Sequence, residues 1–285
     1  MAVFREVTDS DLPALDTFLA AHRDSSMFLR SNLRRSGLSY RPEPFHANYI
    51  ASFDNDRCTG VSAHCWSGML LLQAPEADEE LACACVQHSG RRVTGFSGPL
   101  EQIRRARRAL VLDDAPTLIE SDESLYAVDL ENVIRPSRNP NIQCRPPRPG
   151  ERNLLCEWRF AYAIETSVGT DSEETRQQAH AFLDQQIADG TLWVAADEGR
   201  PVSMSAFNAT LPDIVQIGGV YTPPELRGRG YAKDVVAASL LAAREHGVTR
   251  AVLFTENPSA ARSYEAIGFR RVGEYGLVLF ADTHS

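Results

Sequence analysis

No stretch of the 285-residue sequence approaches the roughly 18 consecutive apolar residues that a membrane-spanning helix needs. The first six residues, Met1 to Glu6, include an early acidic residue and no apolar stretch, so we expect neither a signal peptide nor a membrane partner. Hydrophobic residues make up 43% and charged residues 24%, as is ordinary for soluble globular proteins. The composition therefore favours a folded, non-membrane protein.

The six cysteines also lack a pattern. None forms a C-x-x-C pair, and none has histidines at the spacing of a zinc site. We therefore expect no bound metal, and we predict reduced thiols in a cytoplasmic protein.

Positive charge is scarce, with 29 Lys and Arg against 38 Asp and Glu, which gives a net charge of -9. A general nucleic-acid surface needs clustered cations that displace counterions from phosphates. The one basic run, Arg104 to Arg108, is explained better as the solvated face of a helix. We expect no nucleic-acid partner.

Hydrophobic periodicity in the second half predicts a mixed α/β sheet with helices on both faces, in the order ααβββαβαβ. The three consecutive strands are expected to form an antiparallel meander, and Gly190 and Gly247 are expected to end helices. The expected elements are helices over 151–168 and 173–188, strands over 192–196, 202–211 and 214–221, a helix over 231–246, a strand over 251–255, a helix over 258–267 and a closing strand or hairpin over 270–280.

The first half has a related rhythm, which indicates an internal duplication. A helix, strand and helix around Ser89-Gly90 repeat the pattern found around His246-Gly247. The expected elements are a strand over 3–8, helices over 9–21 and 28–36, strands over 47–53, 60–66 and 69–73, a helix over 76–88, a strand over 92–97 and a helix over 99–110.

The proline-rich segment 136–149 is the predicted linker between a domain over 1–135 and a domain over 150–285. The two domains differ before their long helices. The second has two glycines between Arg227 and Ala232, whereas the first has four carboxylates between Glu76 and Glu80. Such a loop repels a diphosphate, so we expect no catalysis in the first domain.

The segment from Val220 to Ala232 links a predicted strand to a predicted helix. Gly228 and Gly230 allow backbone N–H groups to turn toward a ligand, and the helix that follows adds its positive end. A third glycine of the dinucleotide fingerprint and the G-K-[ST] of a Walker loop are both missing. The segment is thus a predicted anion cradle suited to a diphosphate.

Arg227 to Ala232 reads R-x-x-G-x-A and resembles the CoA-binding motif of the GNAT superfamily of acyl-CoA N-acyltransferases. A second motif of that family, N-x-x-A-x-x-x-Y-x-x-x-G-F, appears from Asn257 to Phe269. The resemblance covers about 135 residues. It implies two GNAT-like domains in tandem, of which only the C-terminal one keeps the CoA motif.

The resemblance also implies a set of site residues and a co-substrate, acetyl-CoA. The two central strands are expected to splay apart around the pantetheine arm, and Tyr264 lies where many members place the acid that protonates the leaving thiolate. The implied cofactor-binding residues are Val220, Tyr221, Arg227, Gly228, Arg229, Gly230, Tyr231, Ala232, Asn257 and Ser259.

Plainer interpretations remain for several of these residues. Tyr264 also fits a core aromatic, and Asn257 fits a helix N-cap followed by Pro258. The arginines of the loop also fit an ordinary surface. Trp158 and Tyr162 fit an acceptor pocket less well than simple packing.

The general base is poorly specified, because in this family it differs between members and acts through water in some. Glu165 and Glu256 are the candidates, and each also fits a solvated carboxylate. The predicted activity is acetyl transfer to a small-molecule amine or amino-acid-like acceptor. Alternatives are a non-catalytic acyl-CoA sensor and a peptidyltransferase that uses aminoacyl-tRNA, which the acidic charge disfavours. The oligomeric state stays open, with a homodimer among the alternatives.

Overall fold

The computed structural model describes residues 3–76, 78–136, 141–166 and 169–281. The chain divides into two compact units, which are described separately. Unit 1 comprises Met1–Leu125 together with Gly273–Ser285, and unit 2 comprises Tyr126–Val272. The predicted ranges of 1–135 and 150–285 remain a prediction beside this division.

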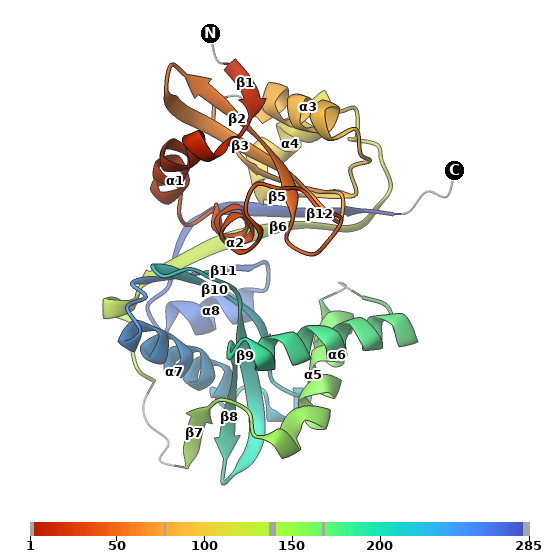
Figure 1. Ribbon diagram of the computed structural model, residues 1–285. Helices are drawn as coiled ribbons and strands as arrows, with labels where there is room; N and C mark the ends of the chain where they lie inside the picture. Colours follow the sequence, from red (N-terminus) through yellow and green to blue (C-terminus); the bar gives the residue numbers. More distant parts are fainter. Residues whose placement is uncertain (1–2, 77, 137–140, 167–168, 282–285) are drawn as a thin grey trace. The chain divides into compact units, whose positions relative to one another are not determined.

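Unit 1 contains a mainly antiparallel sheet covered by four helices (Figure 1). Its strands include the run β1-β2-β3-β4-β5-β12, in which β4 and β5 pair in parallel. The strands are β1 (Val3–Glu6), β2 (Ala47–Asp54), β3 (Arg57–Cys65), β4 (Met69–Gln73), β5 (Gly95–Pro99) and part of β12 (Arg270–Phe280), and the helices are α1 (Leu12–Ala21), α2 (Met27–Ser36), α3 (Asp78–Ser89) and α4 (Leu100–Ala109).

Unit 2 has the order β11-β10-β9-β8-β7, in which β8, β9 and β10 form the expected antiparallel meander and β10 pairs with β11 in parallel. The strands are β7 (Ile142–Arg145), β8 (Leu192–Asp197), β9 (Arg200–Thr210), β10 (Ile214–Tyr221) and β11 (Arg250–Thr255), and the helices are α5 (Arg152–Glu165), α6 (Glu173–Ala188), α7 (Tyr231–Glu245) and α8 (Pro258–Glu265).

The ends of these helices follow from local chemistry. Ser172 caps α6 by accepting a hydrogen bond from the backbone N–H of Thr175. Gly190 follows α6 with a φ of 67°, and Gly247 follows α7 with a φ of 90°. Both glycines adopt left-handed conformations in which a side chain is unfavourable, so both predicted helix ends are confirmed.

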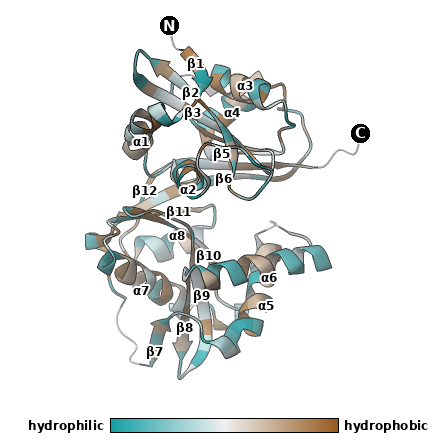
Figure 2. Cartoon of the chain, in the orientation of Figure 1, coloured by the Kyte–Doolittle hydropathy of each residue, from teal (hydrophilic) through white to brown (hydrophobic). Residues whose placement is uncertain are grey.

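The sheet of unit 2 is buried on both faces because its strands carry alternating apolar side chains. Val215 and Ile217 of β10 pack in a cluster with α7 and α8, whereas Met204 and Ala206 of β9 pack with α5 and α6. Figure 2 shows hydrophilic colouring over much of α6, which fits a helix with one buried face. The expected sheet with helices on both faces is confirmed.

Two strands were not predicted. β6 (Thr117–Asp129) carries exposed acidic residues in its first half, which have low strand propensity. β7 lies inside the predicted linker 136–149 and pairs with β8. Residues 137–140 of that segment lie outside the described residues.

Candidate active site

Strands β10 and β11 separate shortly before the predicted diphosphate-binding segment, Val220 to Ala232, begins. Their parallel pairing runs from Ile214 with Arg250 to Gln216 with Val252. Strand β10 then continues to Tyr221 and β11 to Thr255 outside this register. The splay expected between the two central strands is therefore present within unit 2.

A bulge in β10 accompanies the splay. The pairing of β10 with β9 shifts after Gln216 and again between Gly218 and Tyr221. Gly219 lies within the shift at a φ of 60°, a conformation that favours glycine. Because of the bulge, Val220 and the residues beside it do not continue the regular pairing of β10 with β9.

The end of β10 is held by serine. The hydroxyl of Ser203 donates to the carbonyl oxygen of Tyr221 at 2.9 Å and lies 2.8 Å from the hydroxyl of Thr222. Because a carbonyl oxygen has two lone pairs, Tyr221 keeps capacity for a second donor.

The predicted loop forms an open turn at the start of α7. Gly228 and Gly230 have φ values of 77° and 88°, and no heavy atom lies closer than 3.6 Å to a Cβ built on either. In the described chain, no backbone N–H of residues 228–232 donates to another backbone group. Free donors at the positive end of a 15-residue helix suit a diphosphate.

The loop arginine Arg227 contacts the predicted base Glu165. Its Nη2 donates to both carboxylate oxygens of Glu165 at 2.8 and 2.7 Å, and its Nε donates to the carbonyl of Thr222 at 2.9 Å. Both side chains are nearly half exposed. An exposed ion pair contributes about 0–1 kcal/mol, so a phosphate can displace it at little cost.

The other predicted loop residues differ in what their side chains do. Arg229 donates a long hydrogen bond of 3.4 Å to the carbonyl of Glu225. Tyr231 is buried, and its hydroxyl donates to Asp197 at 2.6 Å, a contact that raises the pKa of the phenol. The side chain of Tyr231 therefore belongs to the core. Tyr231 and Ala232 contribute their backbone N–H groups to the loop.

Asn257 caps α8. Its Oδ1 accepts from the backbone N–H groups of Ser259 at 2.8 Å and Ala260 at 3.3 Å, and Pro258 follows at the first helical position. The plainer interpretation of Asn257 is thus correct. Asn257 and Ser259 are both exposed.

Tyr264 is buried on α8, with its ring edge-on to Phe269 at a centroid distance of 5.9 Å. Burial, assisted by the neighbouring phenol of Tyr162, raises the pKa of Tyr264 above its ordinary value. The hydroxyl therefore stays protonated at neutral pH. Tyr264 is therefore a core aromatic whose phenol is desolvated.

A groove of about 560 Å³ lies beside the loop between α5 and the end of β10. It is lined by Glu165 and Tyr221 among the predicted residues, and by Trp158, whose ring centroid lies 6.2 Å from that of Tyr221. Glu256, in contrast, is exposed at the end of β11 and does not line this groove. The structure therefore brings one of the two candidate bases to the groove.

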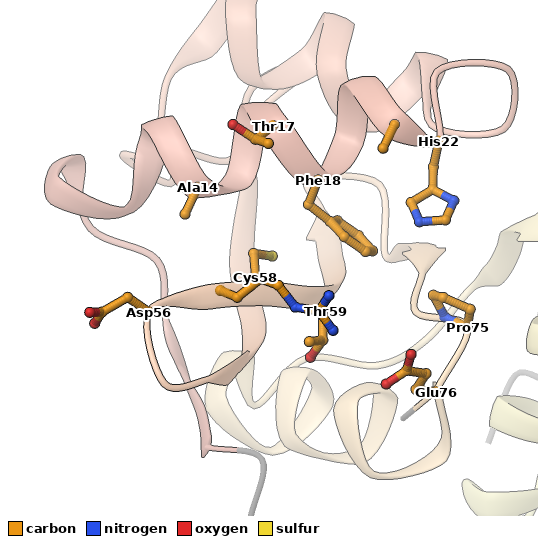
Figure 3. Close-up of a pocket in the computed structure, with 11 residues that line it drawn as sticks. Ala14, Thr17, Phe18, His22, Asp56, Cys58, Thr59, Pro75 and Glu76 are labelled. Carbon is orange, nitrogen blue, oxygen red and sulfur yellow. The ribbon is translucent and has the colours of Figure 1, made fainter.

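A second cavity, of about 700 Å³, lies in unit 1 (Figure 3). Phe18 of α1 and His22, which follows α1, line the cavity with Cys58 of β3, and Glu76 lines it from the segment before α3. Burial raises the pKa of Cys58 to about 11, so this thiol is unreactive at neutral pH. Glu76, the first of the four acidic residues between Glu76 and Glu80, lines this cavity.

Sequence reasoning missed Arg159 of α5. Its Nε and Nη1 are buried without hydrogen-bond partners, and its guanidinium lies beside the bulge of β10. An arginine within the apolar run Trp158 to Tyr162 was a signal that an unusual environment surrounded it.

The described residues contain no cluster of three or more metal-binding side chains and no helix long and apolar enough to cross a membrane.

Comparison with known proteins finds one matching family and several similar folds. Residues 156–269 match the acetyltransferase (GNAT) family. An acetyltransferase from Agrobacterium fabrum is 37% identical over 57 residues, which cover 20% of this chain and 42% of that protein. The match thus spans less than half of the curated relative.

Solved structures resemble nearly the whole chain in fold. A GCN5-related N-acetyltransferase from Kribbella flavida matches with a TM-score of 0.60 and 18% identity over 93% of this chain and 97% of that one. A tandem GNAT protein from the clavulanic acid biosynthesis pathway matches with a TM-score of 0.53 and 12% identity over 99% of this chain and 98% of that one. The predicted tandem GNAT-like fold is confirmed.

Proposed function

We propose that the protein, whose residues 156–269 match the acetyltransferase (GNAT) family, transfers an acetyl group from acetyl-CoA to the primary amine of a small molecule. The observation that carries the proposal is the open turn at residues 228–232, whose backbone N–H groups are free at the N-terminus of α7.

In the proposed binding mode, Arg227 to Ala232 hold the diphosphate and the backbone of Val220 and Tyr221 holds the pantetheine arm. Arg227 leaves Glu165 to reach a phosphate, which the weakness of an exposed pair permits. Asn257 and Ser259, at the start of α8, contact the same arm. No metal is required by this scheme.

The proposed reaction is direct attack of the neutral amine on the thioester carbonyl. The C–N bond forms as the C–S bond breaks, the amine loses a proton and the departing thiolate gains one. Tyr264 is the proposed donor to the thiolate, because its buried phenol stays protonated at neutral pH. Glu165, and next Glu256, are the proposed acceptors of the amine proton, directly or through water.

The proposal includes a cytoplasmic location, which the six free thiols support, and excludes nucleic acid as the acceptor. Unit 1 is proposed to have no catalytic role, since the segment before its long helix carries four carboxylates in place of glycines. A homodimer remains among the alternatives for the assembly.

The test is release of CoA thiol from acetyl-CoA in the presence of a panel of primary amines, with mass spectrometry of the products. We expect amine-dependent release and an N-acetylated product. Binding of CoA without turnover on any amine, together with no effect of Tyr264→Phe, would instead indicate an acyl-CoA sensor.

A further inference from the structure

Arg159 is a partly buried cation, and within the described residues it has no anionic partner. It lies on α5 between Trp158 and Phe160, which line the groove although Arg159 does not, and its Nε and Nη1 are buried with no hydrogen-bond partner. Within the described chain, no carboxylate forms an ion pair with it, whereas Arg152 and Arg176 nearby each have one. Burying the N–H groups of an unpaired charge is costly, so this arrangement lowers the free energy of unfolding.

Two aromatic rings hold the guanidinium in place. Its Cζ lies 4.5 Å from the ring centroid of Phe182 on α6 and 5.0 Å from that of Tyr162 on α5. Contacts of this kind offset part of the desolvation and restrict the side chain, but they do not satisfy its N–H donors. The guanidinium is therefore oriented in advance and keeps free donors.

The free donors face the bulge of β10. A Cβ built on Gly219 would lie 3.2 Å from Nη1 of Arg159 and would meet no other heavy atom within 4 Å. The absence of a side chain at Gly219 thus lets the guanidinium approach the backbone of β10 closely, next to Val220. Tyr162, which contacts Arg159, also acts electrostatically on Tyr264.

We propose that Arg159 binds a carboxylate carried by the substrate, and so selects reactants that are anionic next to the reacting thioester. This proposal rests on the function proposed above, which locates the thioester near Val220. A carboxylate matches the donor fork of a guanidinium and supplies the missing countercharge. Two reactants can bring it: an amino-acid-like acceptor, or an acyl group that ends in a carboxylate.

The first arm of the experiment uses acetyl-CoA with matched acceptors, such as glycine and glycinamide or β-alanine and its amide. For wild type we expect kcat/KM to favour the carboxylate of a pair by about 10- to 100-fold, the range of a hydrogen bond to a charged group. Arg159→Gln should abolish that preference, and Arg159→Lys should retain part of it.

The second arm compares succinyl-CoA with acetyl-CoA by calorimetry and by turnover on amines without a carboxylate. If the acyl group brings the anion, wild type prefers succinyl-CoA and Arg159→Gln does not. Arg152→Gln is the matched control, because Arg152 lies on the same helix and is exposed in a pair with Asp184. It should leave both preferences unchanged.

The assignment is overturned if wild type shows neither preference, or if the preference survives in Arg159→Gln. Equal loss of turnover of carboxylate-bearing and neutral amines in Arg159→Gln, with acetyl-CoA bound normally, removes the role of Arg159 in carboxylate recognition and leaves the acetyltransferase proposal intact. Failure of either thioester to bind wild type instead removes the proposed function itself.

Discussion

The phenol of Tyr264 illustrates how burial changes a residue that sequence alone can only locate. The motif from Asn257 to Phe269 predicts a tyrosine at this position, but not its burial against Phe269 or its proximity to Tyr162. A raised pKa makes the phenol a weaker acid and keeps it fully protonated. Proton transfer then depends on the thiolate forming next to it.

Replacement of Tyr264 by Phe should lower kcat by about 100-fold, the lower range for loss of a general acid, because the ring still packs but the proton is lost. The affinity for CoA should change little. Steady-state kinetics and calorimetry check this. An unchanged kcat in a folded variant contradicts the role of Tyr264.

The same substitution should alter the pH dependence of stability. Since burial raises the pKa of Tyr264, the unfolded chain releases this proton near pH 10 while the folded chain keeps it, so the free energy of unfolding falls as pH rises further. Above pH 10, wild type should lose about 1.4 kcal/mol per pH unit more than Tyr264→Phe. Urea unfolding from pH 8 to 11 measures this, and parallel curves exclude it.

Glu165→Gln should lower kcat by about 100-fold if Glu165 accepts the amine proton, whereas Glu256→Gln should have a smaller effect, because Glu256 does not line the groove. Glu157→Gln is the matched control, since Glu157 is also paired with an arginine and lines the same groove. A loss of CoA affinity with normal kcat would mean that Glu165 only positions Arg227.

At the scale of elements, hydrophobic periodicity predicted most helices and strands, because each carries a regular buried face. It failed for β6, where Glu120 and Asp122 are exposed and acidic residues have a low strand propensity. The loop at Gly228 could be predicted from the sequence because its left-handed conformation favours glycine. The isolation of Arg159 was not, because the absence of a partner depends on tertiary structure.

The bulge of β10 should be sensitive to a single methyl group. Gly219→Ala places a Cβ in a left-handed conformation and 3.2 Å from Arg159, so we expect a loss of about 1–2 kcal/mol in the free energy of unfolding. Gly190→Ala has a similar φ but open space, and isolates the backbone cost. Equal losses in urea titrations would show that the contact with Arg159 carries no energy.

At the scale of the whole molecule, the final strand contributes to unit 1 although it follows unit 2 in the chain. Residues 275–279 of β12 pair antiparallel with β5, and Val278 and Phe280 lie in a core cluster with Leu70, Leu81 and Phe96. The sequence analysis assigned this strand to the predicted domain over residues 150–285. Pairing between segments so distant leaves no local signal.

An aspartate at Val278 should therefore damage unit 1. Val278 is 5% exposed and Val272, on the same strand, is 47% exposed, so Val278→Asp buries a charge and Val272→Asp does not. Hydrogen exchange should show lost protection in β5 for Val278→Asp alone. Equal protection in both variants contradicts the contribution of β12 to this core.

The central claim is that the glycine turn before α7 binds the diphosphate of CoA. Gly230→Asp adds a negative charge there, and repulsion at about 5 Å with an effective dielectric constant near 20 costs about 3 kcal/mol, or roughly 100-fold in affinity. Gly247→Asp, with a φ of 90° against 88° at Gly230, imposes the same strain at the opposite end of α7.

Calorimetric titration of CoA into wild type and these two variants is the most direct test. We predict binding to wild type and to Gly247→Asp with similar affinity, and a loss of about 100-fold or more for Gly230→Asp. Unchanged affinity in a folded Gly230→Asp protein would contradict the assignment of this turn, and with it the proposed active site.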